Sequence, residues 1–201
     1  MDFPRPEILL QDPVPPPLHG MAPRTIMGSA WWDRERHAAA AKNNHKCWAC
    51  NIPKDKARKH KWLEGHECYR TDWLKGTSTL VEVVSLCHYC HNYIHMGRLR
   101  CLLEAGDVSL GFVEDVIRHG DRLTAHLPVR MPIETMATWS DWVLIIDGTP
   151  YPSRFAHQAE WNAYYQWLGL VAKSDTAASL KYFREFVTES RRLQTGATWT
   201  P

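Results

Sequence analysis

Apolar and β-branched residues concentrate in two short stretches near the middle of the chain. Residues 62–67 and 80–86 are rich in the types that suit a half-buried sheet, so each stretch is predicted to form a strand. Residues 91–95 follow and place two histidines four positions apart, on one face if the segment is helical. The pattern predicts two strands and then a helix, which Gly97 is suited to end.

Two longer helices are predicted on either side of these strands. Residues 29–42 are rich in alanine and tryptophan, and Ser29 is the expected N-cap. Residues 110–119 carry apolar side chains at helical spacing behind Ser109, a second N-cap. We expect both helices to pack on the central strands, and Trp62 to belong to the core.

The first 28 residues have a different character, with six prolines among the first seventeen positions. Proline at this density excludes a regular helix, so the segment is predicted to be an extended arm. Such an arm is either disordered or wraps a partner or its own domain. The apolar run Ile8, Leu9 and Leu10 favours docking in a groove.

The pattern changes again near residue 127, where prolines indicate a linker. A strand is predicted over residues 139–146, and Asp147 and Gly148 form a strong hairpin-turn signal. Prolines restrict the returning strand to an edge position. Residues 155–168 and 176–193 are predicted to be amphipathic helices that form a small core or a binding face.

Composition narrows the class of protein. The 201 residues carry a net charge of +2, so any affinity for nucleic acid must be local. No apolar run reaches the roughly 18–20 residues of a membrane span, and the prediction is a soluble, cytoplasmic protein without a membrane partner. Two cysteines outside the motifs, Cys68 and Cys101, are predicted to be small buried hydrophobes.

Four cysteines form two CxxC pairs, which are Cys47 with Cys50 and Cys87 with Cys90. Two such knuckles complete the tetrahedral sulfur shell that zinc favours, and four ordinary buried thiols are the alternative. The thirty-six residues between the pairs exceed the loop of a compact zinc finger, usually about 15–20 residues. The sequence therefore predicts a structural Zn²⁺ site with an insertion.

The insertion and the segment after it hold a second set of metal ligands. His66 lies on the first predicted strand, and His91 and His95 lie on the predicted helix. Three imidazoles can converge on a cation and leave positions open for water or phosphate, which is typical of catalytic sites.

The two strands followed by LCxxCHxxxH on a helix resemble the HNH endonuclease family, in the subtype whose ββα-metal finger is braced by a four-cysteine zinc. The likeness covers residues 47–95. In that family the first strand ends in a His-His or Asp-His pair, of which the first member binds the catalytic metal and the second is the general base. A central Asn orients the base, and the two histidines of CHxxxH complete the metal shell. The chain also resembles small bacterial and phage proteins with a W-L-E-x-H-E strand.

This resemblance assigns roles by position. His66, His91 and His95 take the metal-ligand positions, for Mg²⁺, Mn²⁺, Ni²⁺ or Zn²⁺. Glu67 stands where the family has its base histidine, and Glu82 stands where it has the Asn. A carboxylate acts as a general base when its environment tunes its pKa suitably. The resemblance thus implies either that Glu67 activates water or that the chemistry is lost.

One concentrated basic run lies between the first CxxC pair and the first strand. Beside a hydrolytic metal it would contact phosphates, and a solvated loop is the alternative. Its members are Lys54, Lys56, Arg58, Lys59 and Lys61.

Together these patterns predict an α+β protein with a zinc-braced ββα-metal (HNH-like) finger and a mainly helical C-terminal region containing a β-hairpin. The expected division is an arm and helix (1–44), a zinc-bound domain (45–126) and a C-terminal region (127–201). The expected function is an HNH-type endonuclease that hydrolyses nucleic-acid phosphodiester bonds, most naturally of DNA. The alternative is a catalytically degenerate, zinc-stabilised module that binds nucleic acid, or a protein partner through its C-terminal region.

Overall fold

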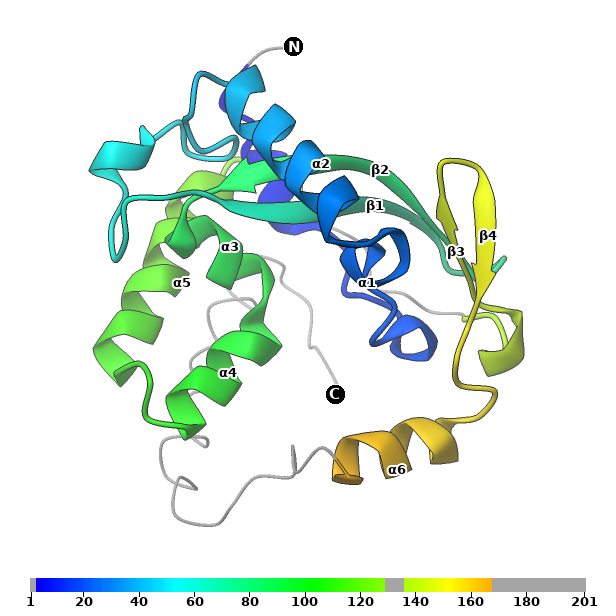
Figure 1. The fold of residues 1–201 in the computed structure, drawn as a ribbon. Coiled ribbons are helices and arrows are strands. Elements are labelled where there is room, and N and C mark those ends of the chain that lie inside the picture. The colour runs from blue at the N-terminus through cyan, green and yellow to red at the C-terminus, as the bar shows by residue number, and fades with distance from the viewer. Residues whose placement is uncertain (1–2, 129–135, 168–201) are drawn as a thin grey trace.

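The computed structural model describes residues 3–128 and 136–167 (Figure 1). Its fold is α+β: N-terminal helices lead into a β-hairpin, further helices follow, and a small second hairpin comes later in the chain. The α-helices are α1 (Pro23–Met27), α2 (Ser29–Lys42), α3 (His88–Ile94), α4 (Met96–Glu104), α5 (Leu110–Thr124) and α6 (Gln158–Trp167). The strands are β1 (Glu64–Asp72), β2 (Thr77–Leu86), β3 (Val143–Ile146) and β4 (Thr149–Pro152). The 3-10 helices are η1 (Pro6–Leu10), η2 (Pro16–Leu18), η3 (Lys54–Lys56) and η4 (Trp139–Asp141).

The central element is the antiparallel hairpin of β1 and β2, which confirms the two predicted strands. β1 begins two residues later than predicted and continues to Asp72, and β2 begins three residues earlier than predicted. His66 lies opposite Val84 in their register, with an irregularity after Cys68. The turn between them contains Gly76 at φ +68°, a left-handed conformation that favours glycine. A Cβ at this position would also lie 2.9 Å from Ala137 Cβ.

The second hairpin joins the same sheet. Strand β3 pairs in parallel with β2, giving the strand order β1-β2-β3-β4. Asp147 and Gly148 form its turn with φ values of +49° and +77°, as the predicted Asp-Gly turn requires. β4 contains two prolines and lies at the edge, as predicted. The sheet therefore contains strands from both sides of residue 127, and the predicted domain division stays a prediction.

Helices cover the central hairpin on two sides (Figure 1). Helix α2 crosses it on one side, and α3, backed by α5, lies on the other. A single core cluster joins these layers and includes Trp48, Leu86, Leu99 and Val116. Trp48 is fully buried and its indole N–H donates to the Ala39 carbonyl at 2.8 Å, so the first CxxC knuckle is fixed to α2.

The N-terminal segment docks on this core, as its apolar run predicts. Ile8 and Leu9 are buried in the core cluster. The prediction of an extended arm is wrong in detail, because the segment forms η1, η2 and α1. Each begins at a proline, Pro6, Pro16 or Pro23, where the missing N–H has no cost and the fixed φ suits a helical start.

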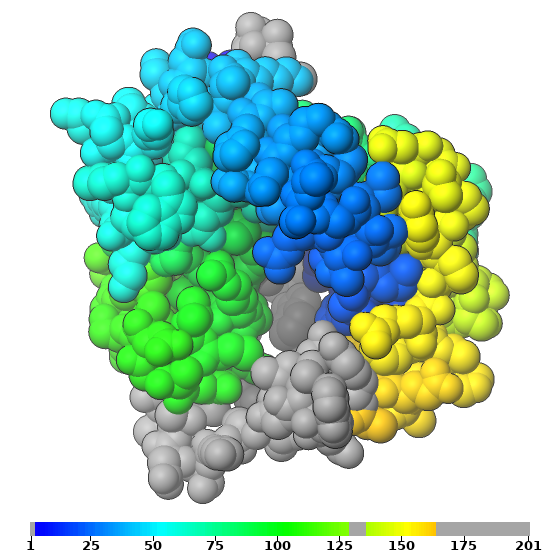
Figure 2. Space-filling model, in the orientation of Figure 1, coloured from blue at the N-terminus to red at the C-terminus, as the bar shows by residue number. Residues whose placement is uncertain are grey.

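A smaller core lies between this segment and the second hairpin. Leu18 is buried with Trp142, Leu144 and Ile146, and Met21 packs against them. Figure 2 shows the N-terminal segment, in blue, against the yellow hairpin. Residues between Gln11 and Ala22 also line a cavity together with His66 and Glu67 of β1, so this segment lies beside the central hairpin as well.

Several predicted helix boundaries need correction. Helix α2 covers the predicted residues, but its N-cap is Gly28, and no side-chain cap is made. Ser109 caps α5 as predicted, because its hydroxyl accepts from the Phe112 N–H at 3.2 Å. Gly97 does not end a helix: α3 ends before His95, and α4 begins directly afterwards because it buries its own apolar face.

Helix α6 begins later than predicted, and the predicted helix over residues 176–193 lies outside the described residues. Among the described helices none is both long enough and apolar enough to cross a membrane.

Candidate metal centre

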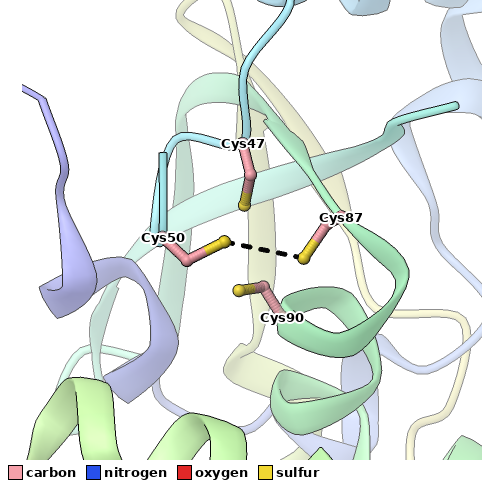
Figure 3. A group of neighbouring side chains, drawn as sticks. All are labelled: Cys47, Cys50, Cys87 and Cys90. Carbon is pink, nitrogen blue, oxygen red and sulfur yellow. Dashed lines mark hydrogen bonds between the residues drawn. The ribbon is translucent and has the colours of Figure 1, made fainter. Parts of the chain in front are cut away.

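The two CxxC pairs converge on one point. The Sγ atoms of Cys47, Cys50, Cys87 and Cys90 all lie within 4.8 Å of one another and point inward (Figure 3). The Cys50 and Cys87 sulfurs are 3.7 Å apart. Zinc–sulfur bonds of about 2.3 Å in a tetrahedron give sulfur separations of about 3.8 Å, so the donor set fits zinc.

Local hydrogen bonds shape both knuckles. In the first, Asn51 adopts a positive φ of +59° and its N–H donates to the Cys47 carbonyl at 2.8 Å. In the second, the His91 N–H donates to the Cys87 carbonyl at 2.9 Å where α3 begins. His119, which the sequence gave no reason to place here, brings its Nε2 within 3.3 Å of Cys90 Sγ. An imidazole N–H in this position stabilises a thiolate.

The predicted histidines also come together. His66 extends from β1, His91 from α3 and His95 from the residue after α3, and one ligand atom of each lies within 4.8 Å of the others. His95 Nε2 and His66 Nδ1 are 2.9 Å apart. His66 Nε2 is buried without a hydrogen-bond partner among the described residues. Three imidazoles on a rigid hairpin and helix can therefore hold a cation.

The protonation states of these histidines suit metal binding. Burial lowers the pKa of His66 well below its usual value, and the nearby imidazoles lower it further. Burial, with His91 and Arg98 nearby, lowers the pKa of His95 to about 4. Both rings are thus neutral near pH 7, the form in which histidine ligates metals.

A third group, which sequence reasoning missed, adjoins the three histidines. His60, Glu64 and His88 place one ligand atom each within 4.8 Å of the others. Burial alone would raise the pKa of Glu64, but hydrogen bonds from His88 and His91 outweigh it and hold this pKa well below its usual range. The sequence periodicity could have indicated this group. Glu64 is two positions before His66 on a strand, and His88 is three before His91 on a helix, so each shares a face with a predicted metal ligand.

The predicted base, Glu67, stays outside the histidine cluster. Side chains alternate along a strand, so Glu67 shares the face of Gly65, where an added Cβ would lie 2.8 Å from the Trp32 ring on α2. Glu67 nevertheless lines one cavity of about 380 Å³ together with His66 and His95. Burial raises its pKa, opposed by a hydrogen bond from its own backbone N–H and by the nearby His91 and Arg24 side chains.

Glu82 does not take the place of a base-orienting residue. Its carboxylate forms an ion pair with Arg5 at 2.8 Å, and its backbone lies opposite Cys68 in the hairpin register. Glu82 therefore ties the N-terminal segment to β2, and no hydrogen bond or ion pair joins it to Glu67 in the described part of the chain.

The basic run folds back over α3 and α5. The Arg58 guanidinium lies 5.5 Å from the Tyr89 ring centre, and the Lys59 ammonium lies 5.5 Å from that of Phe112. Lys61 donates to a backbone carbonyl, whereas Lys54 and Lys56 are exposed. Two basic side chains of the run are therefore exposed to solvent, and the other three contact aromatic rings or a backbone carbonyl of the protein.

Trp62, which was predicted to be in the core, is 59% exposed. Its indole stacks on the His60 ring, with centroids 3.6 Å apart and planes 3° from parallel. The prediction failed because hydrophobicity alone does not distinguish a core tryptophan from one that covers a polar site. An exposed aromatic ring therefore lies directly beside the third ligand group.

Comparisons with protein-family models, with curated proteins and with solved structures give no match for this chain.

Proposed function

We propose that the chain is a metal-dependent endonuclease of the HNH type. One observation carries this proposal: His66, His91 and His95 converge on the hairpin and helix that a four-cysteine cluster braces. A metal ion with four cysteine ligands has no open coordination position and serves to stabilise the fold. Three imidazoles leave coordination positions for water and substrate. This pairing of sites, in this order along the chain, is the one expected for a zinc-braced HNH finger.

The roles follow from the donor types. The four cysteines would hold structural zinc and fix the start of α3, and thereby His91 and His95. A divalent cation on the three histidines would stabilise negative charge on the oxygens of a scissile phosphodiester. Lys54 and Lys56 would contact neighbouring phosphates without reading bases.

Glu67 is the candidate proton acceptor because it shares the cavity wall with His66 and His95. In the described residues its carboxylate has no ion-pair partner, and the cavity beside it has room for a water molecule. Its task would be to accept the proton that this water loses as it attacks phosphorus.

A second function remains, and the position of Glu67 favours it. Glu67 lines the cavity but does not belong to the cluster of three histidines, and Glu82 is tied to Arg5. A finger with this geometry and no working base would bind nucleic acid or protein without cutting. The exposed Trp62 beside the basic run would serve such binding equally well.

Incubation with supercoiled plasmid and Mg²⁺, Mn²⁺, Ni²⁺ or Zn²⁺ tests the proposal. We expect nicked and linear products, loss of cutting with a chelator, and at least a hundredfold slower cutting by His95→Ala. His126→Ala, which removes an exposed histidine beyond α5, is the matched control and should cut at the wild-type rate. Equal rates for both variants would show that the activity arises elsewhere.

A further inference from the structure

We propose that His60, Glu64 and His88 form a second divalent-cation site, joined to the three-histidine site through the Glu64 carboxylate. This inference concerns metal binding and does not depend on nuclease activity.

The first argument is the geometry of three atoms. His60 Nε2 lies 3.0 Å from His88 Nδ1 and 3.1 Å from Glu64 Oε1, and His88 Nδ1 lies 2.6 Å from the same oxygen. Around a tetrahedral ion with bonds of about 2.0–2.1 Å, ligand atoms are separated by about 3.3 Å. The two distances from His60 Nε2 match this separation within a few tenths of an ångström. The distance between His88 Nδ1 and Glu64 Oε1 would have to lengthen modestly on metal binding.

The second argument is that hydrogen atoms cannot satisfy this triangle. The carboxylate is ionised and supplies no hydrogen, so each edge to it needs an N–H from histidine. If both nitrogens donate to Glu64, two N–H groups lie side by side with their nitrogens 3.0 Å apart and no acceptor between them. If either nitrogen lacks its hydrogen, its lone pair faces the carboxylate instead. With the carboxylate ionised, each of these arrangements leaves one pair of atoms on which two N–H groups or two lone pairs meet, and a cation bound by all three atoms removes that mismatch.

Burial strengthens the attraction to a cation. The side chains of His60, Glu64 and His88 retain only 14%, 16% and 9% of their exposure. Trp62 covers the outer face of His60. Low exposure weakens solvent screening, so the attraction between the Glu64 carboxylate and a bound cation is stronger here than at the surface.

The other oxygen of Glu64 provides the link to the three-histidine site. It accepts a short hydrogen bond from His91 Nδ1, and the Arg98 guanidinium lies 3.6 Å from it. In a neutral imidazole, donation from Nδ1 leaves Nε2 without a hydrogen, which is the form that binds metal. Glu64 would therefore ligate the second ion and orient a ligand of the first.

The donor set indicates the class of ion. Two imidazole nitrogens and one carboxylate oxygen match the ligands of catalytic zinc sites and favour zinc, cobalt or nickel over magnesium or calcium. Three protein ligands leave a position for water or a substrate oxygen.

Cobalt titration of the full-length, zinc-loaded protein tests the inference. We expect two cobalt ions per chain in addition to the zinc, counted by native mass spectrometry and calorimetry. Cobalt–thiolate absorption should be absent, which shows that zinc stays on the cysteines. His60→Ala should bind one cobalt ion, and His126→Ala should bind two. A single cobalt ion in the wild type, or two in His60→Ala, would overturn the proposal.

Anomalous diffraction from wild-type crystals soaked in cobalt avoids any effect of substitution on folding. We expect separate peaks at the two ligand groups, and a lone peak among His66, His91 and His95 would contradict the second site. Neither readout includes cleavage. A chain that binds two cobalt ions but cuts no DNA would support this inference and overturn the nuclease proposal.

Discussion

Replacing Gly120 by alanine should destabilise the fold at the contact that holds α3 in place. Gly120 is buried in α5, and a Cβ there would lie within 3.0 Å of the Tyr93 ring. The nearest ring atoms include Cγ, which lies on the Cβ–Cγ axis and does not move when the ring rotates about χ2. Ring rotation therefore cannot relieve the clash. Either α3 must move away from α5, or Tyr93 must leave its rotamer.

The magnitude follows from three terms. Overpacking a buried site costs about 1–3 kcal/mol. The Tyr93 hydroxyl donates to Asp121 at 2.9 Å, and straining this bond adds about 1 kcal/mol. Alanine gains about 0.5–1 kcal/mol over glycine in a helix. The net loss is about 1–3 kcal/mol, or a fall in Tm of roughly 2–10 °C for a chain of this size.

Gly111→Ala is the matched control, because Gly111 lies exposed on the same helix and its nearest atom is 3.9 Å from an added Cβ. We expect this variant to be as stable as the wild type or up to about 1 kcal/mol more stable. Urea unfolding at fixed zinc, followed by tryptophan fluorescence, measures both. Equal stabilities for Gly120→Ala and Gly111→Ala would refute the packing argument.

Three further predictions address the metal site and the surface. Cys87→Ser should lose zinc and unfold the finger, since zinc binding contributes about 10–16 kcal/mol in small zinc-finger peptides; a folded variant with full zinc content would contradict this. Lys54→Gln combined with Lys56→Gln should reduce the slope of log affinity against log salt on duplex DNA by about 0.9 per lost contact, and an unchanged slope would assign both side chains to solvent. Iodoacetamide at pH 8 should modify Cys101 before Cys68, because burial raises the pKa of Cys68 to about 12; mass spectrometry of peptides would reveal the reverse order.

Local periodicity predicted much of this fold. It predicted the range of α2, the Asp-Gly turn and the two strands of the central hairpin, because each of these depends on residues close together in sequence. The pairing of β3 with β2 could not be predicted in this way, because a parallel partner comes from a distant segment and leaves no local signal.

The residues of the candidate metal sites also fall into those that local sequence predicted and those that only the fold brings together. Fixed spacings identified the cysteines and two of the histidines, since CxxC and His-xxx-His dictate their own geometry. His60 and His119 become neighbours of the site only through the tertiary fold, whereas Glu64 could have been found from its position two residues before His66 on β1. Glu67 was predicted from its sequence position, but strand alternation and the docked N-terminal segment decide what it contacts.

The most direct test of the proposed nuclease follows DNA binding and strand breakage in the same sample. Zinc-loaded protein is mixed with supercoiled plasmid and Mn²⁺, and each time point is run on gels with and without prior removal of protein. The account predicts that nicked and linear DNA accumulate and persist after the protein is removed. Retarded plasmid that returns fully to the supercoiled form on removal of the protein, whichever divalent ion is supplied, would contradict it and identify a binding module.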